Sequence, residues 1–158
     1  MNIFTTSLAF IEVPNKISLA IFTVGCEHNC KGCSNKALNE MPNPSMFKCS
    51  EEDFLKNVSN SIGLIDGICW LGGDPLYQEE EFLKYIKTTK QNYPLLFNCL
   101  YTGYQFEKIN NEVKEYVDFI IDGKWTGKVL SDPETNQRIF KKENNNWKKI
   151  DYKIFKGE

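Results

Sequence analysis

The sequence has no excess of positive charge, and Arg138 is its only arginine. Its 158 residues include 19 lysines and arginines against 21 aspartates and glutamates, which gives a formal net charge of −2. Binding to nucleic acid or to an anionic membrane surface usually needs a basic patch or stripe. Neither class of partner is therefore expected.

Long apolar runs are also missing. No segment approaches the roughly 20 consecutive apolar residues of a membrane helix. Residues 1–11 show neither the basic leader nor the cleavage site of a secretory signal. The sequence thus predicts a cytoplasmic protein, and its length suits one domain rather than a closed eight-unit α/β barrel of about 250 residues.

Short apolar runs alternate with helical patterns between residues 17 and 123. Residues 17–24 are apolar on both faces, as in a strand buried in a parallel sheet. Further strands are predicted over 67–71, 95–101 and 119–121, and helices over 51–62, 78–92 and 106–116. This alternation is typical of parallel βαβ units in an α/β fold.

The C-terminal part differs from this core. Residues 138–142 and 147–152 are amphipathic and flank a turn-prone stretch, 143–146, which predicts a β-hairpin. We expect a single domain over 1–158, with a core over about 17–123 and an extension over about 124–158.

Three of the six cysteines, Cys26, Cys30 and Cys33, lie within eight residues directly after the first predicted strand. In a reducing compartment such a group indicates metal binding or catalysis rather than disulfides. A closed zinc site takes four ligands, and here the fourth would be His28 or Cys49. A [4Fe–4S] cluster held by three thiolates leaves one iron free, and His28 is then a solvated or second-shell residue.

The other cysteines have different settings. Cys69 and Cys99 lie inside apolar strand runs, where a free cysteine packs as a small hydrophobic side chain. Cys49 precedes the first predicted helix, and its role stays open. A chance grouping of inert thiols is the remaining alternative for the three clustered cysteines.

Two motifs together resemble the radical S-adenosylmethionine (SAM) superfamily. The first is the Cys-x3-Cys-x2-Cys spacing, and the second is Gly-Gly-Asp-Pro at 72–75, at the end of the next predicted strand. Within the superfamily, residues 24–36 are similar to the activating proteins of anaerobic ribonucleoside-triphosphate reductase, including Gly32 where most members carry an aromatic residue. Further similar blocks, in family order, are 71–76, 101–104, 121–124 and 136–138.

The resemblance implies a partial, open parallel β/α barrel of the radical SAM type. It also implies that Cys26, Cys30 and Cys33 ligate three irons of a [4Fe–4S] cluster while SAM chelates the fourth. Gly72 and Gly73, together with the carboxylate of Asp74, would hold the methionine ammonium group. Main-chain atoms near the adenine are implied for Gly32, Cys33 and Ser34.

The implied reaction begins with one electron from an external reductant such as flavodoxin. Reductive cleavage of SAM gives a 5′-deoxyadenosyl radical, which takes a hydrogen atom from a glycine of the reductase. No acid–base pair is needed, since the cofactors carry the difficult chemistry. The alternatives are an activase of another glycyl-radical enzyme such as pyruvate formate-lyase, and, from a different class, a zinc-binding interaction module.

Several residues near the predicted strand ends have two possible roles, in packing or in ligand contact. Aromatic side chains there are expected to pack in the core or at the rim, although one could stack on adenine in place of the aromatic missing at Gly32. Asp122 could contact ribose, but capping a turn is favoured. The aromatic candidates are Trp70, Tyr77, Tyr101 and Tyr104.

Overall fold

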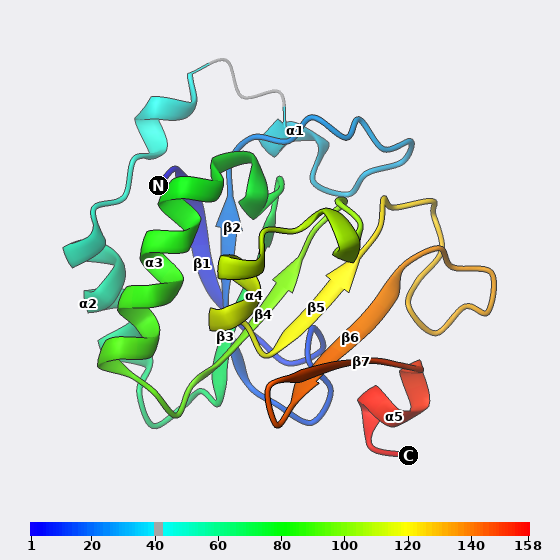
Figure 1. Cartoon of the computed structure of the whole chain (residues 1–158). Helices are drawn as coiled ribbons and strands as arrows, with labels where there is room; N and C mark the ends of the chain where they lie inside the picture. The colour runs from blue at the N-terminus through cyan, green and yellow to red at the C-terminus, as the bar shows by residue number, and fades with distance from the viewer. Residues whose placement is uncertain (40–42) are drawn as a thin grey trace.

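A computed structural model describes residues 1–39 and 43–158, and its strands form one seven-stranded sheet in the order β1 to β7 (Figure 1). Strands β2 to β5 are parallel, whereas β1, β6 and β7 each run antiparallel to their neighbour. The strands are β1 (Ile3–Ala9), β2 (Ser18–Thr23), β3 (Gly67–Gly72), β4 (Phe97–Tyr101), β5 (Phe119–Asp122), β6 (Arg138–Glu143) and β7 (Asn146–Ile150). Because β1 and β7 form the two edges, the sheet is open, which confirms the predicted α/β fold with a parallel core.

The longer helices between the parallel strands cover one face of the sheet, and the last helix of the chain packs on the other face (Figure 1). The α-helices are α1 (Lys36–Asn39), α2 (Glu51–Ser61), α3 (Glu79–Asn92), α4 (Asn111–Tyr116) and α5 (Tyr152–Lys156), and the 3-10 helices are η1 (Pro44–Phe47), η2 (Pro75–Gln78) and η3 (Phe106–Lys108). Helix α2 begins where predicted because Ser50 caps it, accepting a hydrogen bond from the Asp53 N–H. No helix in the described parts of the chain is long and apolar enough to cross a membrane.

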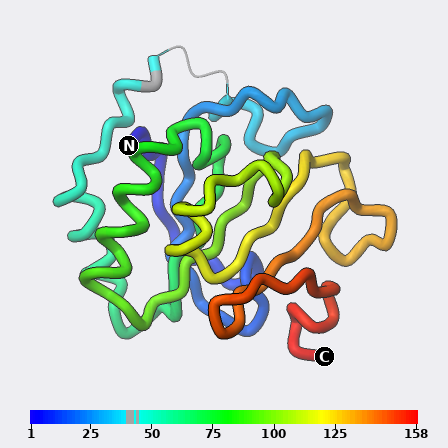
Figure 2. The backbone as a smooth tube through the Cα atoms, viewed as in Figure 1, coloured from blue at the N-terminus to red at the C-terminus, as the bar shows by residue number. Residues whose placement is uncertain are grey.

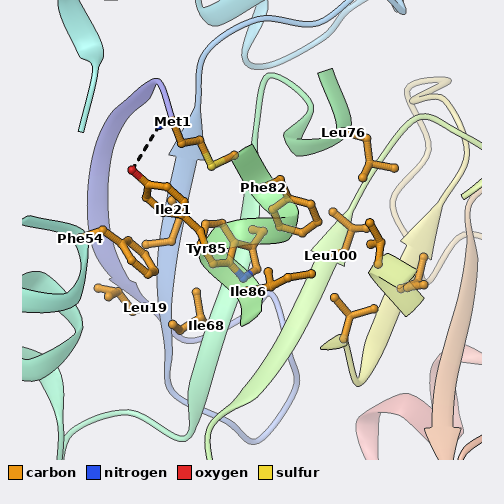
Figure 3. Close-up of a cluster of buried hydrophobic side chains, with 14 of the residues drawn as sticks. Met1, Leu19, Ile21, Phe54, Ile68, Leu76, Phe82, Tyr85, Ile86 and Leu100 are labelled. Carbon is orange, nitrogen blue, oxygen red and sulfur yellow. Dashed lines mark hydrogen bonds between the residues drawn. The ribbon is translucent and has the colours of Figure 1, made fainter. Parts of the chain in front are cut away.

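The main hydrophobic core lies between the sheet and helices α2, α3 and α4. Figure 3 shows side chains of β2 and β3 meeting Phe54 of α2 and Phe82 of α3. Trp70, on β3, is fully buried there, and its indole N–H donates to the Asn98 side chain at 3.0 Å. This burial accounts for Trp70 as a core residue and removes it from the candidates for adenine binding.

The opposite face of the sheet has a smaller core. Cys69 and Cys99 are paired in register on β3 and β4 and are fully buried, which confirms their predicted packing role. The segment between β1 and β2 covers them, since Val13 belongs to the same cluster. Phe155 of α5 packs there too, so two segments outside the parallel core cover this smaller core.

Two features differ from the sequence prediction, and a third is confirmed. Residues 3–9 form an edge strand that was not predicted, because its Thr and Ser side chains are mostly exposed and show no clear alternation. The predicted helix over 106–116 was wrong: it is divided into η3 and α4, because the Asn110 side chain accepts from the Glu112 N–H and begins a new helix. The hairpin is confirmed, with Asn144 and Asn145 at positive φ in its turn, and it also extends the main sheet through β5.

Candidate functional site

The carboxyl ends of the parallel strands open into a cavity of about 450 Å³. Loops that follow strands of this kind meet at one edge of a sheet, where ligand sites are commonly built. In Figure 2 the loop after β2 and the loop between β5 and β6 both lie at this end of the sheet. The lining includes Cys26, His28, Cys30, Cys33, Ser34, Asn39, Gly72, Gly73, Asp74, Tyr101, Thr102, Gly103 and Trp125.

The three clustered cysteines all line this cavity and are half-buried. The loop is shaped by Asn29 and Gly32, which have φ angles of 50° and 71°. Backbone geometry turns one N–H toward sulfur: His28 N donates to the Sγ of Cys26 at 3.4 Å. Burial raises the pKa of the Cys26 thiol, and this hydrogen bond acts in the opposite direction.

Asn39, at the end of α1, also faces the thiols. Its Nδ2 atom is 3.8 Å from the Sγ of Cys33. Its Oδ1 atom is buried without a hydrogen-bond partner among the described residues. An unsatisfied buried acceptor is costly, so this amide suits a site that binds a polar group.

The glycine loop after β3 is pressed against the start of the cysteine loop. The Gly73 N–H donates to the Thr23 carbonyl at 2.8 Å, and the Asp74 N–H donates to the Gly25 carbonyl at 2.8 Å. A Cβ atom at position 73 would lie 2.2 Å from that carbonyl oxygen, and one at Gly72 would lie 2.4 Å from the Thr23 nitrogen. Both glycines are therefore required by close backbone approach.

Asp74 and His28 are in direct contact. The His28 Nε2 atom is 2.8 Å from the Asp74 Oδ2 atom, and the two side chains are only 7% and 2% exposed. His28 is therefore buried rather than solvated, and it lies within the cysteine loop, between Cys26 and Cys30. The Sγ of Cys26, a ring nitrogen of His28 and a carboxylate oxygen of Asp74 lie within 4.8 Å of one another, which is close enough to hold a metal ion.

The remaining sequence candidates separate into two sets. Tyr101 lines the cavity and donates its hydroxyl to the Glu12 carbonyl at 2.7 Å. Tyr104 donates its hydroxyl to Glu27 and contacts the His28 ring edge-on, with centroids 4.4 Å apart. Tyr77 is 54% exposed and lies against Gly25 rather than on the cavity lining.

Two open assignments are now decided by position. Cys49 packs beside the main core, and its carbonyl accepts from the Tyr85 hydroxyl, so it is outside the cavity lining. Asp122 is fully buried, accepts from the Phe106 N–H and pairs with Arg138. It anchors a loop and a strand, which agrees with the capping role that the sequence favoured.

Sequence reasoning missed Trp125, Thr102 and Gly103 as cavity residues. The indole N–H of Trp125 donates to the Gly32 carbonyl at 3.2 Å, across 93 positions of the chain. Thr102 and Gly103 fall in a block that was noticed only as a family resemblance, 101–104. Their position directly after β4, at the same sheet edge as the other two motifs, is the signal that could have identified them.

Comparisons with known proteins agree with this geometry. Residues 16–146 match the family described as a 4Fe-4S single cluster domain. The anaerobic ribonucleoside-triphosphate reductase-activating protein of Enterobacteria phage T4 is 34% identical over 138 residues, which cover 82% of this chain and 87% of that protein. The protein of the same name from Escherichia coli K12 is 29% identical over 119 residues, 72% of this chain and 77% of that protein. That of Haemophilus influenzae is 27% identical over 111 residues, covering 66% and 72%.

Proposed function

The chain belongs to the family of anaerobic ribonucleoside-triphosphate reductase-activating proteins, with a 4Fe-4S single cluster domain, and from this membership we propose that it is a radical SAM activase that generates a glycyl radical on that reductase. The observation that carries the proposal is the meeting of three cysteines and a Gly-Gly loop on one cavity. The match to a 4Fe-4S domain favours the cluster over a zinc-binding module. The relatives are activating proteins of the anaerobic ribonucleotide reductase, which favours this enzyme over pyruvate formate-lyase.

The residues of the cavity fit a cluster held by Cys26, Cys30 and Cys33. The thiols are half-buried, and an N–H donor and the Asn39 amide face two of the sulfurs. Hydrogen bonds to sulfur and burial both adjust the potential of such a cluster. When bound, the reduced cluster supplies the electron that cleaves SAM to methionine and the 5′-deoxyadenosyl radical, which then takes a hydrogen atom from a glycine of the reductase.

SAM is proposed as the second cofactor, with its methionine end at Gly72 and Gly73. The close approach of these glycines to β2 leaves no side chain between the backbone and a ligand. Their carbonyl groups can accept hydrogen bonds from an ammonium group. Main-chain atoms of the cysteine loop are proposed to lie near the adenine, at Gly32, Cys33 and Ser34, of which Cys33 and Ser34 line the cavity directly.

The chain's own residues otherwise orient the reactants and restrict water. Tyr101 and Thr102 form part of the cavity wall. We further propose that the protein works in the cytoplasm as one domain and accepts its electron from an external donor such as flavodoxin. The six free thiols are compatible with a reducing compartment.

The test is anaerobic reconstitution with iron and sulfide, followed by addition of a reductant and SAM. The expected result is about four irons per chain, formation of 5′-deoxyadenosine, and a glycyl doublet in the EPR spectrum after the reductase is added. Cys26→Ala should lose 5′-deoxyadenosine formation by at least about 100-fold, since it removes a cluster ligand.

The matched control is Cys49→Ala, a cysteine outside the cavity, which should keep activity within about twofold of the wild type. A colourless protein that binds zinc and forms no 5′-deoxyadenosine would reject the proposed function. Equal activity of Cys26→Ala and the wild type would reject the assignment of the cluster ligands.

A further inference from the structure

We propose that Asp74 is a positioning residue for the cysteine loop, acting through His28, and that it is not a ligand of the SAM ammonium group. This inference rests on the proposed function, because it concerns how the cluster is retained. It replaces the implied role of the Asp74 carboxylate with a structural link between three loops.

The Asp74 carboxylate is already saturated with donors. Its Oδ1 atom accepts from the Leu76 N–H at 2.9 Å, and the Thr102 hydroxyl lies 3.0 Å from Oδ1 and 2.9 Å from Oδ2. Its Oδ2 atom accepts from the Gly103 N–H at 2.8 Å and is 2.8 Å from the His28 Nε2 atom. A carboxylate offers about four acceptor sites, so none is left for a ligand ammonium group.

Burial supports the same conclusion. Asp74 borders the cavity but is only 2% exposed, and a ligand that bonded to its carboxylate would displace one of the four donors already there. Displacement would leave a buried hydrogen-bond partner unsatisfied, which is strongly unfavourable. The methionine end of SAM is better served by the carbonyl groups of Gly72 and Gly73, which line the cavity.

His28 carries the link into the cysteine loop. It stands between Cys26 and Cys30, and its Nε2 atom holds the proton because a carboxylate only accepts hydrogen bonds. The ring is packed directly on Gly103, where an added Cβ would lie 2.3 Å from the His28 Cδ2 atom. The close packing on Gly103 and the contact with Asp74 together fix the position of the ring.

The link joins three loops at the carboxyl edge of the sheet. Asp74 follows β3, Thr102 and Gly103 follow β4, and His28 lies in the loop after β2. Thr102 is itself tied to β5 through its N–H and the Ile121 carbonyl at 3.0 Å. The cysteine loop is thus anchored to three parallel strands by one buried carboxylate.

Outer-sphere partners of this kind typically contribute 10- to 100-fold to metal affinity. We therefore expect reconstituted His28→Ala and Asp74→Asn to lose iron to a chelator about tenfold faster than the wild type. The Michaelis constant for SAM, measured by 5′-deoxyadenosine formation in the remaining loaded protein, should stay within about twofold. His28→Gln, whose amide can still donate to Asp74, should recover part of the iron retention.

The control is Tyr104→Phe, which removes a different bond between the same two loops, the one from Tyr104 to Glu27. It should release iron at a rate within about twofold of the wild type. The double variant His28→Ala/Asp74→Asn should release iron no faster than the faster single variant, because the two residues act as one unit. Circular dichroism spectra establish that each variant is folded.

Several outcomes would overturn the inference. One is a Michaelis constant for SAM raised tenfold or more in Asp74→Asn with iron release unchanged, which indicates direct SAM binding. Others are an equal loss of iron in Tyr104→Phe, or wild-type iron release in both His28→Ala and Asp74→Asn. Failure of the proposed function is distinguishable, since a wild type that binds iron but leaves SAM intact still reports iron release.

Discussion

At the scale of single residues, Trp125 supplies the cavity with the aromatic side chain that the cysteine loop lacks at Gly32. Its indole N–H donates to the Gly32 carbonyl at 3.2 Å, and the side chain lines the cavity. Gly32 has a φ of 71°, and no atom of the described residues lies within 4 Å of the position that a Cβ would take. The space beside Gly32 is therefore bordered by an aromatic residue from a distant loop.

We predict that Trp125→Ala raises the Michaelis constant for SAM by about tenfold, because stacking of a base on an aromatic ring contributes about 1–3 kcal/mol. Trp125→Phe should raise it less, since a ring is kept and only the hydrogen bond to Gly32 is lost. The measurement is 5′-deoxyadenosine formation over a range of SAM concentrations. The control is Trp147→Phe, in the hairpin and away from the cavity, which should not change the Michaelis constant for SAM. The prediction is contradicted if Trp125→Ala has the same Michaelis constant as the wild type.

Sequence reasoning identified residues of the site unequally. The thiols and the glycines were predicted because each group is local: Cys26 to Cys33 lie in one loop, and Gly72 and Gly73 are adjacent. Trp125 could not be predicted, because its role depends on a contact with Gly32 that only the folded sheet creates. The saturation of Asp74 was hidden for the same reason.

At the scale of secondary structure, the C-terminal hairpin is fastened to the parallel core by a buried charge pair. Asp122, at the end of β5, is fully buried, and the Nε atom of Arg138 on β6 donates to it at 3.0 Å. The guanidinium group also forms two hydrogen bonds with Glu107 of η3, which lower the pKa of Glu107 to about 2. The only arginine of the chain thus joins two strands and a 3-10 helix.

We predict that Arg138→Leu lowers the free energy of unfolding by about 3–5 kcal/mol, because it leaves the Asp122 carboxylate buried without its partner. Arg138→Lys should lose less, since a cation is retained without the planar fork. Urea unfolding followed by tryptophan fluorescence under anaerobic conditions measures both. Lys148→Leu removes an exposed pair with Glu143 and should cost less than about 1 kcal/mol. A loss in Arg138→Leu as small as that in Lys148→Leu would count against the prediction.

Secondary structure could be predicted where a pattern is strong and failed where tertiary contacts decide. The strand over 17–24 was correct to within a residue at each end because both of its faces are buried. The predicted helix over 106–116 broke because the Asn110 side chain accepts from the Glu112 N–H and restarts it. Strand β1 was missed because pairing with β2, rather than its own apolar pattern, holds it in the sheet.

At the scale of the whole molecule, the open sheet leaves the cavity accessible from the side that a complete barrel would close. The segment between β1 and β2 packs on the face of the sheet that carries Cys69 and Cys99, and the Val13 side chain of this segment is buried there. Ile11 of the same segment lines the cavity and yet is 83% exposed. Burial of this apolar side chain against the polypeptide that delivers the glycine would favour docking.

The last prediction separates SAM cleavage from delivery of the radical. Ile11→Asp should weaken docking of the reductase about tenfold, because it places a charge where an apolar contact is expected. The glycyl EPR doublet at limiting reductase should fall accordingly, while 5′-deoxyadenosine formation without the reductase stays within about twofold. The matched control is Leu95→Asp. Leu95 is 96% exposed and precedes β4, so it lies at the amino ends of the parallel strands, away from the cavity at their carboxyl ends. A full glycyl signal in Ile11→Asp, or an equal loss in Leu95→Asp, would show that the reductase approaches the cavity by another route.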